Sequence, residues 1–407
     1  MIPDYLSFPH LAHQKVHLGV TGSIAAYKSL ELLRDLIHAS FKVSVTMTAA
    51  AQKFIRPLSF QALGADTVHT QLFSSQTEVY GHLQPGQEAQ VMVIAPATAN
   101  CLAKSAWGLA DDILSCQVLS FAGPLLLAPA MNPNLWLAPA TQHNVHTRRS
   151  RGVEIITPDS GSVACGDQGP GKLPGLEQIY FHVLRALTPA RLKDKRVLIT
   201  LGPTREHWDP VRFWSNPSSG KMGCALAIAA WMQGAEVHCV CGPHQQDLPL
   251  EIQQYPIQSA AEMQDICQKL WPEMDLGCLT AAVSDFRPRS FGTEKFKKAA
   301  LQDEPLQIEF ESNPDILQTL GQTKTPHQKL IGFAAETGVN LEQLALDKLH
   351  KKNLDLIVAN RINHPQSGFN SQTNQVLILD KSQDMQELPV LSKGEVAWKI
   401  WDRIIRL

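Results

Sequence analysis

Residues able to bind and activate a phosphorylated ligand are densest in the stretch Ile199–Gly223, which reads ITLGPTREHWDPVRFWSNPSSGKMG. The stretch begins as an apolar strand, turns at Gly202, and ends with Asn216, two serines and Lys221 before an alanine-rich segment. Charged, glycine and proline residues directly after a strand are typical of a nucleotide or phosphate site, because the following helix start attracts an anion. The sequence therefore predicts an active site at the beginning of the second half of the chain.

A second cluster of this kind follows the first apolar run of the chain. Lys15–Thr21 is a predicted strand, Gly22 and Ser23 form a turn, and Ile24–Ala39 is a predicted amphipathic helix. A glycine lets a ligand approach the backbone, and the helix start behind it favours a phosphate. Ser23 on its own is equally well explained as a helix cap. The turn lacks the GxGxxG pattern, so a dinucleotide is not indicated.

Three further loops in the first half carry small and polar residues directly after predicted strands or turns. They are APATAN at 95–100, PAMNPNLW at 129–136 and ACGDQGPG at 164–171. Each alone is typical of an ordinary loop. Together with TGSIAAYK and the pair Gly81-His82, they resemble the homo-oligomeric flavin-containing cysteine decarboxylase family over about residues 15–185.

This resemblance implies FMN as cofactor and phosphopantothenoylcysteine as substrate. The implied FMN-binding residues are Gly22, Ser23, Ile24, Thr48, Ala97, Thr98 and Asn100. The implied catalytic residues are His82, Asn132 and Cys165. Oxidation of the thiol-bearing carbon to a thioaldehyde would give the electron sink that a plain carboxylate lacks, and FMN can accept the hydride.

The family gives each of these catalytic residues a role. His82 would help to deprotonate the thiol, and Asn132 would hold the amide and carboxylate. Cys165, on a glycine-rich flap, would donate the proton that completes reduction of the enethiolate. By composition alone, His82 would be a surface residue and Cys165 a structural one. The chain departs from the family pattern at Pro85, Gln90 and Lys172, where no catalytic group is lost.

The second half carries four more candidate segments besides Ile199–Gly223. They are AAVSDFRP at 281–288, EKFKK at 294–298, NPDI with FAAET at 313–316 and 333–337, and a predicted helix carrying Lys348 and Lys352. A cluster such as EKFKK is usually a solvated face. As a set these segments resemble phosphopantothenate–cysteine ligase over residues 195–400, with departures at Leu201 and Ser284.

The ligase resemblance implies that CTP activates the phosphopantothenate carboxylate as an acyl-cytidylate, which the cysteine amine then attacks. The implied CTP-binding residues are Leu279, Thr280, Ala281, Asp285, Lys295, Asn313, Pro314, Asp315, Ile316, Phe333, Lys348 and Lys352. Asn216 would act on the acyl-cytidylate or its oxyanion, and Lys295 would assist catalysis. Mg²⁺ is expected with CTP, without identified ligands. Arg205, Asp209 and Arg212 then become scaffold or subunit-contact residues.

The elements that must position these residues alternate between strand and helix in both halves. The predicted fold class is α/β, with two doubly wound Rossmann-like domains: a flavodoxin-like FMN-binding decarboxylase domain and a nucleotide-binding ligase domain. The predicted boundaries are a loose extension at 1–14, the decarboxylase at 15–188, a linker at 189–194 and the ligase at 195–407. This order resembles the bacterial bifunctional family of coenzyme A biosynthesis.

Composition limits the alternatives. The 36 Lys and Arg balance 38 Asp and Glu, so the charge does not indicate nucleic acid or a membrane surface as a partner. No apolar run approaches a membrane span, and the N-terminus lacks a signal-peptide pattern, so a cytoplasmic protein with reduced thiols is expected. A flavoprotein acting as a regulatory binding subunit is the main rival function, and an NAD oxidoreductase is a third. The resemblance further implies a homo-oligomer, a dodecamer built from decarboxylase trimers and ligase dimers.

Overall fold

The computed structural model of the chain describes residues 3–72, 83–162, 166–297, 305–336, 341–361 and 370–407. His82 and Cys165 lie outside these residues. The chain forms two compact units. The first contains Pro9–Pro189, and the second contains Ala190–Leu407 together with the N-terminal segment Pro3–Phe8.

The first unit is built on a six-stranded sheet in which every neighbouring pair is parallel. The strands are β1 (Lys15–Val20), β2 (Lys42–Met47), β3 (Thr67–His69), β4 (Val91–Ala97), β5 (Leu125–Pro129) and β6 (Glu154–Ile155). Their order, β3-β2-β1-β4-β5-β6, reverses direction between β1 and β4. In such sheets ligands bind beyond the carboxyl ends of the strands at this switch point.

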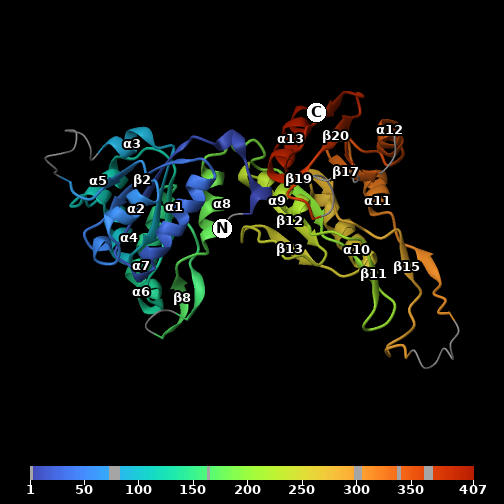
Figure 1. The fold of residues 1–407 in the computed structure, drawn as a ribbon, viewed down its shortest axis with the longest axis horizontal. Helices are drawn as coiled ribbons and strands as arrows, with labels where there is room; N and C mark the ends of the chain where they lie inside the picture. The colour runs from blue at the N-terminus through green and yellow to red at the C-terminus, as the bar shows by residue number, and fades with distance from the viewer. Residues whose placement is uncertain (1–2, 73–82, 163–165, 298–304, 337–340, 362–369) are drawn as a thin grey trace. The chain divides into compact units, whose positions relative to one another are not determined.

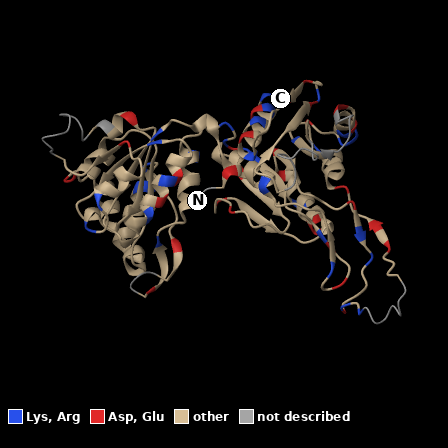
Figure 2. Cartoon of the chain, viewed as in Figure 1, with Lys and Arg blue, Asp and Glu red and all other residues tan. Residues whose placement is uncertain are grey.

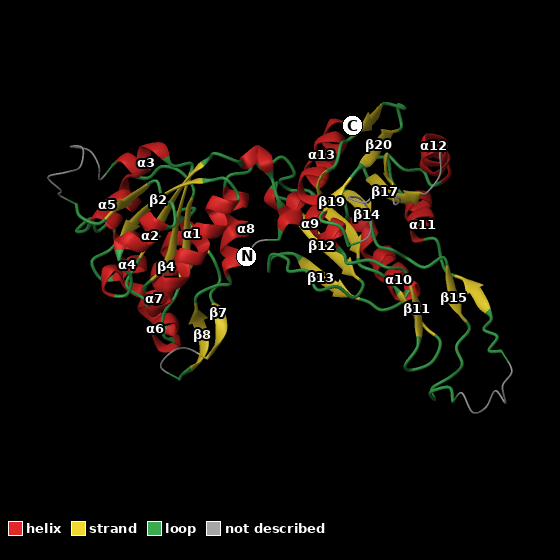
Figure 3. Ribbon diagram, viewed as in Figure 1, coloured by secondary structure: helices red, strands yellow, loops and turns green. Residues whose placement is uncertain are grey.

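Helices cover the sheet of the first unit on both faces, as the doubly wound prediction requires (Figures 1 and 3). They are η3 (Ile24–Tyr27), α1 (Lys28–His38), α2 (Pro57–Ala62), α3 (Gln84–Glu88), α4 (Ala99–Trp107), α5 (Ile113–Ser120), α6 (Pro133–Leu137), α7 (Pro139–Ser150) and α8 (Leu176–Ala186). The apolar side of α1 is buried through Leu32, Leu33 and Leu36. Helix α3 accommodates Pro85 in its first turn, where the missing N–H is not needed.

The second unit contains an eight-stranded sheet. Its strands are β9 (Arg196–Leu201), β12 (Glu236–Cys241), β13 (Gln253–Pro256), β14 (Leu276–Leu279), β17 (Lys329–Glu336), β18 (Leu356–Arg361), β20 (Val376–Asp380) and β21 (Met385–Glu387). The order is β13-β12-β9-β14-β17-β18-β20-β21, parallel as far as β18 and antiparallel at the last two pairings. Its switch point lies between β9 and β14. The doubly wound prediction is confirmed here too, with two antiparallel strands added.

Five α-helices of the second unit carry or cover its sheet: α9 (Lys221–Met232), α10 (Ala260–Leu270), α11 (Ile316–Thr323), α12 (Leu341–Lys351) and α13 (Lys393–Arg406). The alanine-rich α9 is almost wholly buried, and it packs between β9 and α13. Small side chains allow this close approach, and Trp401 of α13 donates its indole N–H to the Leu226 carbonyl at 3.0 Å.

Two small hairpins extend from the second unit and carry many of its exposed aromatic side chains. They pair β10 (Arg205–His207) with β11 (Phe213–Ser215), and β15 (Phe286–Pro288) with β16 (Phe310–Ser312). A third pair, β19 (Thr373–Asn374) with β22 (Leu391–Ser392), lies beside α13.

The segment Pro3–Phe8 differs from the loose extension expected before the first strand. Its 3-10 turn η1 (Asp4–Leu6) packs on α13 and α9, leaving Tyr5 and Leu6 only 1% and 2% exposed. Ser392 donates its hydroxyl to the Ser7 carbonyl at 2.8 Å. The apolar side chains Tyr5, Leu6 and Phe8 explain the difference, because burying them stabilises the contact.

Acidic and basic residues are interspersed along the ribbon of both units (Figure 2). Across the described residues, no helix is both long and apolar enough to span a bilayer.

Candidate active sites

A cavity of about 660 Å³ opens beyond the carboxyl ends of the strands in the first unit. Its lining comes from the turn after β1, the turn after β2, the start of α4, helix α5 and the loop after β5. These residues are Thr21, Gly22, Ser23, Thr48, Ala49, Ala50, Thr98, Ala99, Asn100, Cys101, Lys104, Ser105, Asp112, Leu114, Ser115, Val118, Ala130, Met131 and Leu135. The cavity thus lies at the switch point of this sheet.

Two helix starts meet at this cavity. Ser23 caps η3 by accepting the Ala25 N–H at 3.3 Å, and Thr98 caps α4 by accepting the Cys101 N–H at 3.3 Å. Thr21 joins the two turns, because its hydroxyl donates to Pro96 O at 2.7 Å and accepts the Thr98 N–H at 3.1 Å. A helix start that faces a cavity suits an anion such as a phosphate.

The cavity wall fits a flavin in shape and chemistry. A Cβ on Gly22 would lie 2.4 Å from the Ala50 Cβ, so the two loops approach as closely as they do only with glycine here. Leu114, Val118 and Met131 offer apolar surface for a flat ring system. The Ser105 hydroxyl is buried without a hydrogen-bond partner, which leaves a polar group for a ligand.

Cys101 is a poor candidate for thiolate chemistry in this cavity. Burial, aided by the Asp112 carboxylate, raises the pKa of its thiol to about 12. A thiol with that pKa stays neutral near pH 7, so it contributes packing rather than a nucleophile.

The structure brings most of the expected FMN residues together. Gly22, Ser23, Thr48, Thr98 and Asn100 line the cavity. Ile24 and Ala97 are outside the lining, since the Ile24 side chain is 59% exposed and Ala97 is buried inside β4.

Asn132 is the expected catalytic residue of the first unit that can be located. It caps α6, its Oδ1 accepts the Asn134 N–H at 2.8 Å, and its amide donates to Asp167 Oδ2 at 2.5 Å. Asp167 precedes the strand β8 (Gln168–Lys172), which pairs with β7 (Asp159–Ser162). The expected residues His82 and Cys165 are outside the described part of the chain.

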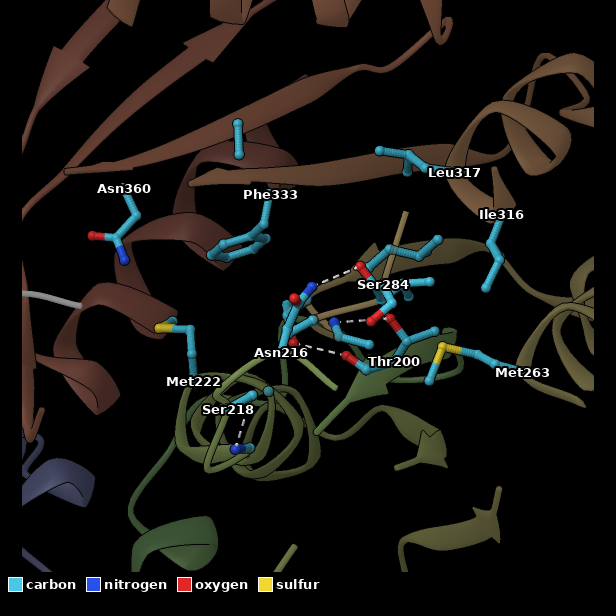
Figure 4. Close-up of a pocket in the computed structure, with 18 of the residues that line it drawn as sticks. Thr200, Asn216, Ser218, Met222, Met263, Ser284, Ile316, Leu317, Phe333 and Asn360 are labelled. Atoms are coloured by element: carbon cyan, nitrogen blue, oxygen red, sulfur yellow. Dashed lines mark hydrogen bonds between the residues drawn. The ribbon is translucent and has the colours of Figure 1, made fainter. Parts of the chain in front are cut away.

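A second cavity, of about 580 Å³, opens beyond β9 and β14 in the second unit. Thr200, Asn216 and residues 279–285 lie along its middle. Figure 4 shows Met222 and Asn360 at one end, Ile316, Leu317 and Met263 at the other, and Phe333 with Ser284 between. This is again the switch point of a doubly wound sheet.

All but one of the expected CTP residues line this cavity, together with Asn216. The lining includes Leu279, Thr280, Ala281, Asp285, Asn313, Pro314, Asp315, Ile316, Phe333, Lys348 and Lys352. Lys295 does not line it and is exposed on the loop that follows β15. The next residue, Phe296, is held elsewhere, because its N–H donates to Asp209 Oδ2 at 3.1 Å and its ring packs on Trp208.

The polar groups in the middle of the cavity are fixed by the backbone. Asn216 donates its amide to the Val283 carbonyl at 3.0 Å, and Thr200 accepts the Ala281 N–H at 3.2 Å. Asn313 donates to the Ser284 carbonyl at 2.8 Å, while its Oδ1 is buried without a partner. A buried acceptor without a donor is unfavourable, so this atom fits a ligand with an amino or hydroxyl group.

The Met222 end of this cavity is lined by Lys221, which belongs to the predicted stretch Ile199–Gly223, and by Lys393 and three amides that the sequence did not indicate. Lys221 and Lys393 begin α9 and α13, and Asn360, Asn370 and Asn374 lie with them. Nothing in the local sequence marked Lys393, because a lysine after a serine at a helix start is usually solvated.

Apart from Lys221, the charged residues of Ile199–Gly223 are scaffold rather than cavity lining. Asp209 accepts the backbone N–H groups of Val211 and Arg212 at 2.8 and 2.7 Å, and the Arg212 guanidinium at 2.6 Å. Burial acts to raise the pKa of Asp209, but these hydrogen bonds outweigh it and hold the pKa at about 2. Glu206 accepts the Ala260 N–H at 3.0 Å.

Comparison with known proteins places both units of the chain in known families. Residues 8–188 match the Flavoprotein family, and residues 192–407 match the family described as DNA/pantothenate metabolism flavoprotein C-terminal domain. The chain is 41% identical over 402 residues to the coenzyme A biosynthesis bifunctional protein CoaBC of Bacillus subtilis, covering 98% of each chain. The chain belongs to the CoaBC family.

A second CoaBC relative agrees with this assignment. The Escherichia coli K12 protein is 40% identical over 397 residues, covering 97% of each chain. A crystal structure of the C-terminal domain of a CoaBC protein is 41% identical, covers 53% of this chain and 97% of that one, and gives a TM-score of 0.45.

As a CoaBC protein, the chain is a bifunctional enzyme of coenzyme A biosynthesis. The first unit is its flavoprotein decarboxylase half, and the second is its ligase half. The predicted family, fold class and pair of activities are confirmed.

Proposed function

We propose that the ligase half joins phosphopantothenate to cysteine at the expense of CTP, and that the decarboxylase half converts the resulting phosphopantothenoylcysteine to phosphopantetheine with FMN. The observation that carries the proposal is the placement of two separate cavities at two switch points, one lined by most of the expected FMN-binding residues and the other by most of the expected CTP-binding residues. The ligase acts first although its unit comes second in the chain.

In the ligase cavity, Asn216 is proposed to hold the activated carboxylate. Its amide is already oriented by the Val283 carbonyl, so little reorganisation is needed when charge develops on a reacting oxygen. Phe333 offers a flat surface for the base, and the free Oδ1 of Asn313 can accept from the base or ribose. Lys295 would have to reach the cavity from its exposed loop when substrates bind.

Mg²⁺ is proposed to enter with the nucleotide. Among the described residues, no group of three or more His, Cys, Asp or Glu side chains is placed to hold a metal ion. Asp285 and Asp315 supply carboxylates in the cavity. This donor set suits Mg²⁺, which commonly binds through one or two carboxylates and the phosphates of its substrate.

In the decarboxylase cavity, Gly22, Ser23 and Thr98 are proposed to hold the FMN phosphate near the two helix starts, and Leu114, Val118 and Met131 to pack against the ring. When bound, FMN supplies the oxidation that gives the substrate an electron sink for loss of carbon dioxide. Asn132, held by Asp167, would orient the substrate amide. His82 and Cys165 keep the proposed roles of thiol base and proton donor.

The chain is further proposed to act in the cytoplasm as a homo-oligomer, a dodecamer of decarboxylase trimers and ligase dimers. Exposed large apolar side chains on both units support association, including Leu58 and Trp107 in the first and Val211 and Trp214 in the second. Substitution of Trp214 by Glu should break the ligase dimers and leave decarboxylase trimers, so that light scattering gives about a quarter of the wild-type mass.

Two assays on the purified protein test the proposed function. Continuous pyrophosphate release over many turnovers should require CTP, phosphopantothenate and cysteine together, and it should be slower when ATP replaces CTP. Acid treatment should release FMN in proportion to protein. A protein that binds flavin but releases neither pyrophosphate nor carbon dioxide would instead be a regulatory flavoprotein.

A further inference from the structure

Two lysines approach each other at the Met222 end of the ligase cavity. Lys221 is the first residue of α9 and Lys393 the first residue of α13, and both line the cavity. Met222, labelled in Figure 4, marks this end, and Asn374 donates its amide to the Met222 sulfur at 3.5 Å. Helix α9, strand β19 and helix α13 therefore meet around one basic cluster of Lys221 and Lys393, which we call the Lys221–Lys393 cluster.

Lys393 is built into the protein rather than solvated. The residue is only 4% exposed, and its ammonium donates to Asn374 Oδ1 at 2.7 Å. An ammonium has three donors, so this single contact leaves capacity for a ligand. Burial, together with repulsion from the Lys221 ammonium, lowers the pKa of Lys393 to about 8.

The positive charge of this cluster is not balanced by protein carboxylates. Lys221 donates to the Asn370 carbonyl at 3.1 Å and to Gln372 Oε1 at 3.3 Å, both of which are neutral. Within the described part of the chain, neither lysine forms an ion pair with Asp or Glu. Lys352 at the other end of the cavity differs, because it pairs with Asp315 at 2.9 Å.

The start of α9 adds donors on the same side. Gly220 is the cap residue of this helix and supplies no side-chain cap. A helix start without a capping side chain offers its backbone N–H groups to an anion. Gly223 fixes this helix start tightly, since a Cβ there would lie 2.4 Å from the Leu201 Cβ.

We propose that the Lys221–Lys393 cluster binds a phosphate group of a ligase substrate. A buried ammonium, that of Lys393, next to the like-charged and half-buried ammonium of Lys221 is unfavourable unless an anion binds between them. Two substrates of the proposed ligase carry such a group: the nucleotide, through its triphosphate, and phosphopantothenate, through its phosphate monoester. This inference rests on the proposed ligase function and assigns a role to residues outside the expected nucleotide set.

The test compares Lys393→Met with Lys399→Met, an exposed lysine on the same helix, in steady-state ligase assays. For Lys393→Met we expect the KM of a phosphate-bearing substrate to rise about 10- to 100-fold, because a charge-assisted contact is lost. The KM for cysteine and the decarboxylase rate with supplied phosphopantothenoylcysteine should not change. If only the KM for CTP rises, the cluster binds the triphosphate. If only the KM for phosphopantothenate rises, the cluster binds the phosphate monoester.

Because Lys393 is buried, Lys221→Met and Lys393→Arg are tested in parallel. Lys221→Met should raise the same KM, and Lys393→Arg should restore part of the affinity if charge is what matters. Pyrophosphate and inorganic phosphate should raise the thermal midpoint of the wild-type ligase unit more than that of Lys221→Met. Unchanged KM values for both phosphate-bearing substrates in Lys221→Met and Lys393→Met overturn the inference. Absence of CTP-dependent pyrophosphate release by the wild-type protein would instead contradict the proposed ligase function.

Discussion

At the scale of single residues, the ligase cavity depends on polar groups whose positions the backbone already fixes. Asn216 and Asn313 each donate to a main-chain carbonyl, at 3.0 and 2.8 Å. Such preorganised groups stabilise a transition state because they need not turn when charge develops. Their substitution should therefore affect rate more than folding.

Asn216→Ala should lower the ligase kcat about 100- to 1,000-fold, as expected for removal of one positioned donor near a developing charge. The decarboxylase rate with supplied phosphopantothenoylcysteine should stay unchanged and serves as an internal control. Pyrophosphate release under saturating substrates measures the effect. A ligase rate within a factor of about two of wild type would remove Asn216 from the proposed site.

His17 carries a prediction about stability and pH. It is fully buried in β1, bonded through Nδ1 to the Ser44 hydroxyl at 2.7 Å, and near His69 and Gln117. Burial, with repulsion from His69, lowers its pKa to about 3. Because the unfolded chain takes up this proton near pH 6.5, stability is present above that pH and is lost as the pH falls toward 3.

Replacing His17 with Gln removes this proton uptake. Between pH 7.5 and pH 5, protonation linked to His17 alone should lower the free energy of unfolding of the wild-type first unit by about 2 kcal/mol. The decrease in the His17→Gln variant over the same pH range should be smaller by that amount. Urea unfolding followed by flavin release at both pH values measures the difference. Parallel pH dependence in the two proteins would contradict the argument.

At the scale of elements, the flavoprotein cavity depends on a close approach between the turn after β1 and the turn after β2. The Cβ of Gly22→Ala would lie 2.4 Å from the Ala50 Cβ and must push the turns apart. The purified variant should contain much less FMN, measured by the ratio of flavin to protein absorbance. Gly175→Ala is the matched control, because its Cβ would meet nothing closer than 4.0 Å. Equal flavin content in both variants would contradict this account.

The parts of the fold and of the sites that could be predicted are those whose signals are close together in the sequence. Strands, turns and helix starts such as Lys15–Thr21, Gly22 and Ser23 could be predicted because apolar runs and glycines are adjacent in the chain. The place of Lys393 beside Lys221 could not be predicted, because β19, α9 and α13 meet only through tertiary packing. For Lys295 the local composition of EKFKK did favour a solvated face, and the family resemblance alone assigned the residue to the nucleotide.

At the scale of the whole molecule, the N-terminal segment Pro3–Phe8 belongs to the second unit although it precedes the first. Gly394 allows this contact, since a Cβ there would lie 2.7 Å from the Ser7 carbonyl oxygen. The ring of Tyr5 lies 5.8 Å from the Lys221 ammonium, which ties the segment to the wall of the ligase cavity. Residues near both ends of the chain therefore pack together in the second unit.

Leu6→Ala should destabilise the ligase unit by about 2 to 4 kcal/mol, the usual loss for a large buried side chain. The urea midpoint of ligase activity should fall, while the midpoint of flavin release should not, since the first unit lacks this contact. Leu58→Ala, at a 70% exposed position, is the control. A shift of the flavin-release midpoint alone would contradict the assignment of Pro3–Phe8 to the second unit.

The central claim is that one chain carries both reactions in sequence. The most direct measurement supplies the purified protein with CTP, phosphopantothenate and cysteine labelled at its carboxyl carbon, and follows labelled carbon dioxide and pyrophosphate together. We predict equal amounts of both products, with no labelled carbon dioxide when either CTP or phosphopantothenate is omitted. Pyrophosphate without carbon dioxide, or labelled carbon dioxide without CTP, would contradict the account.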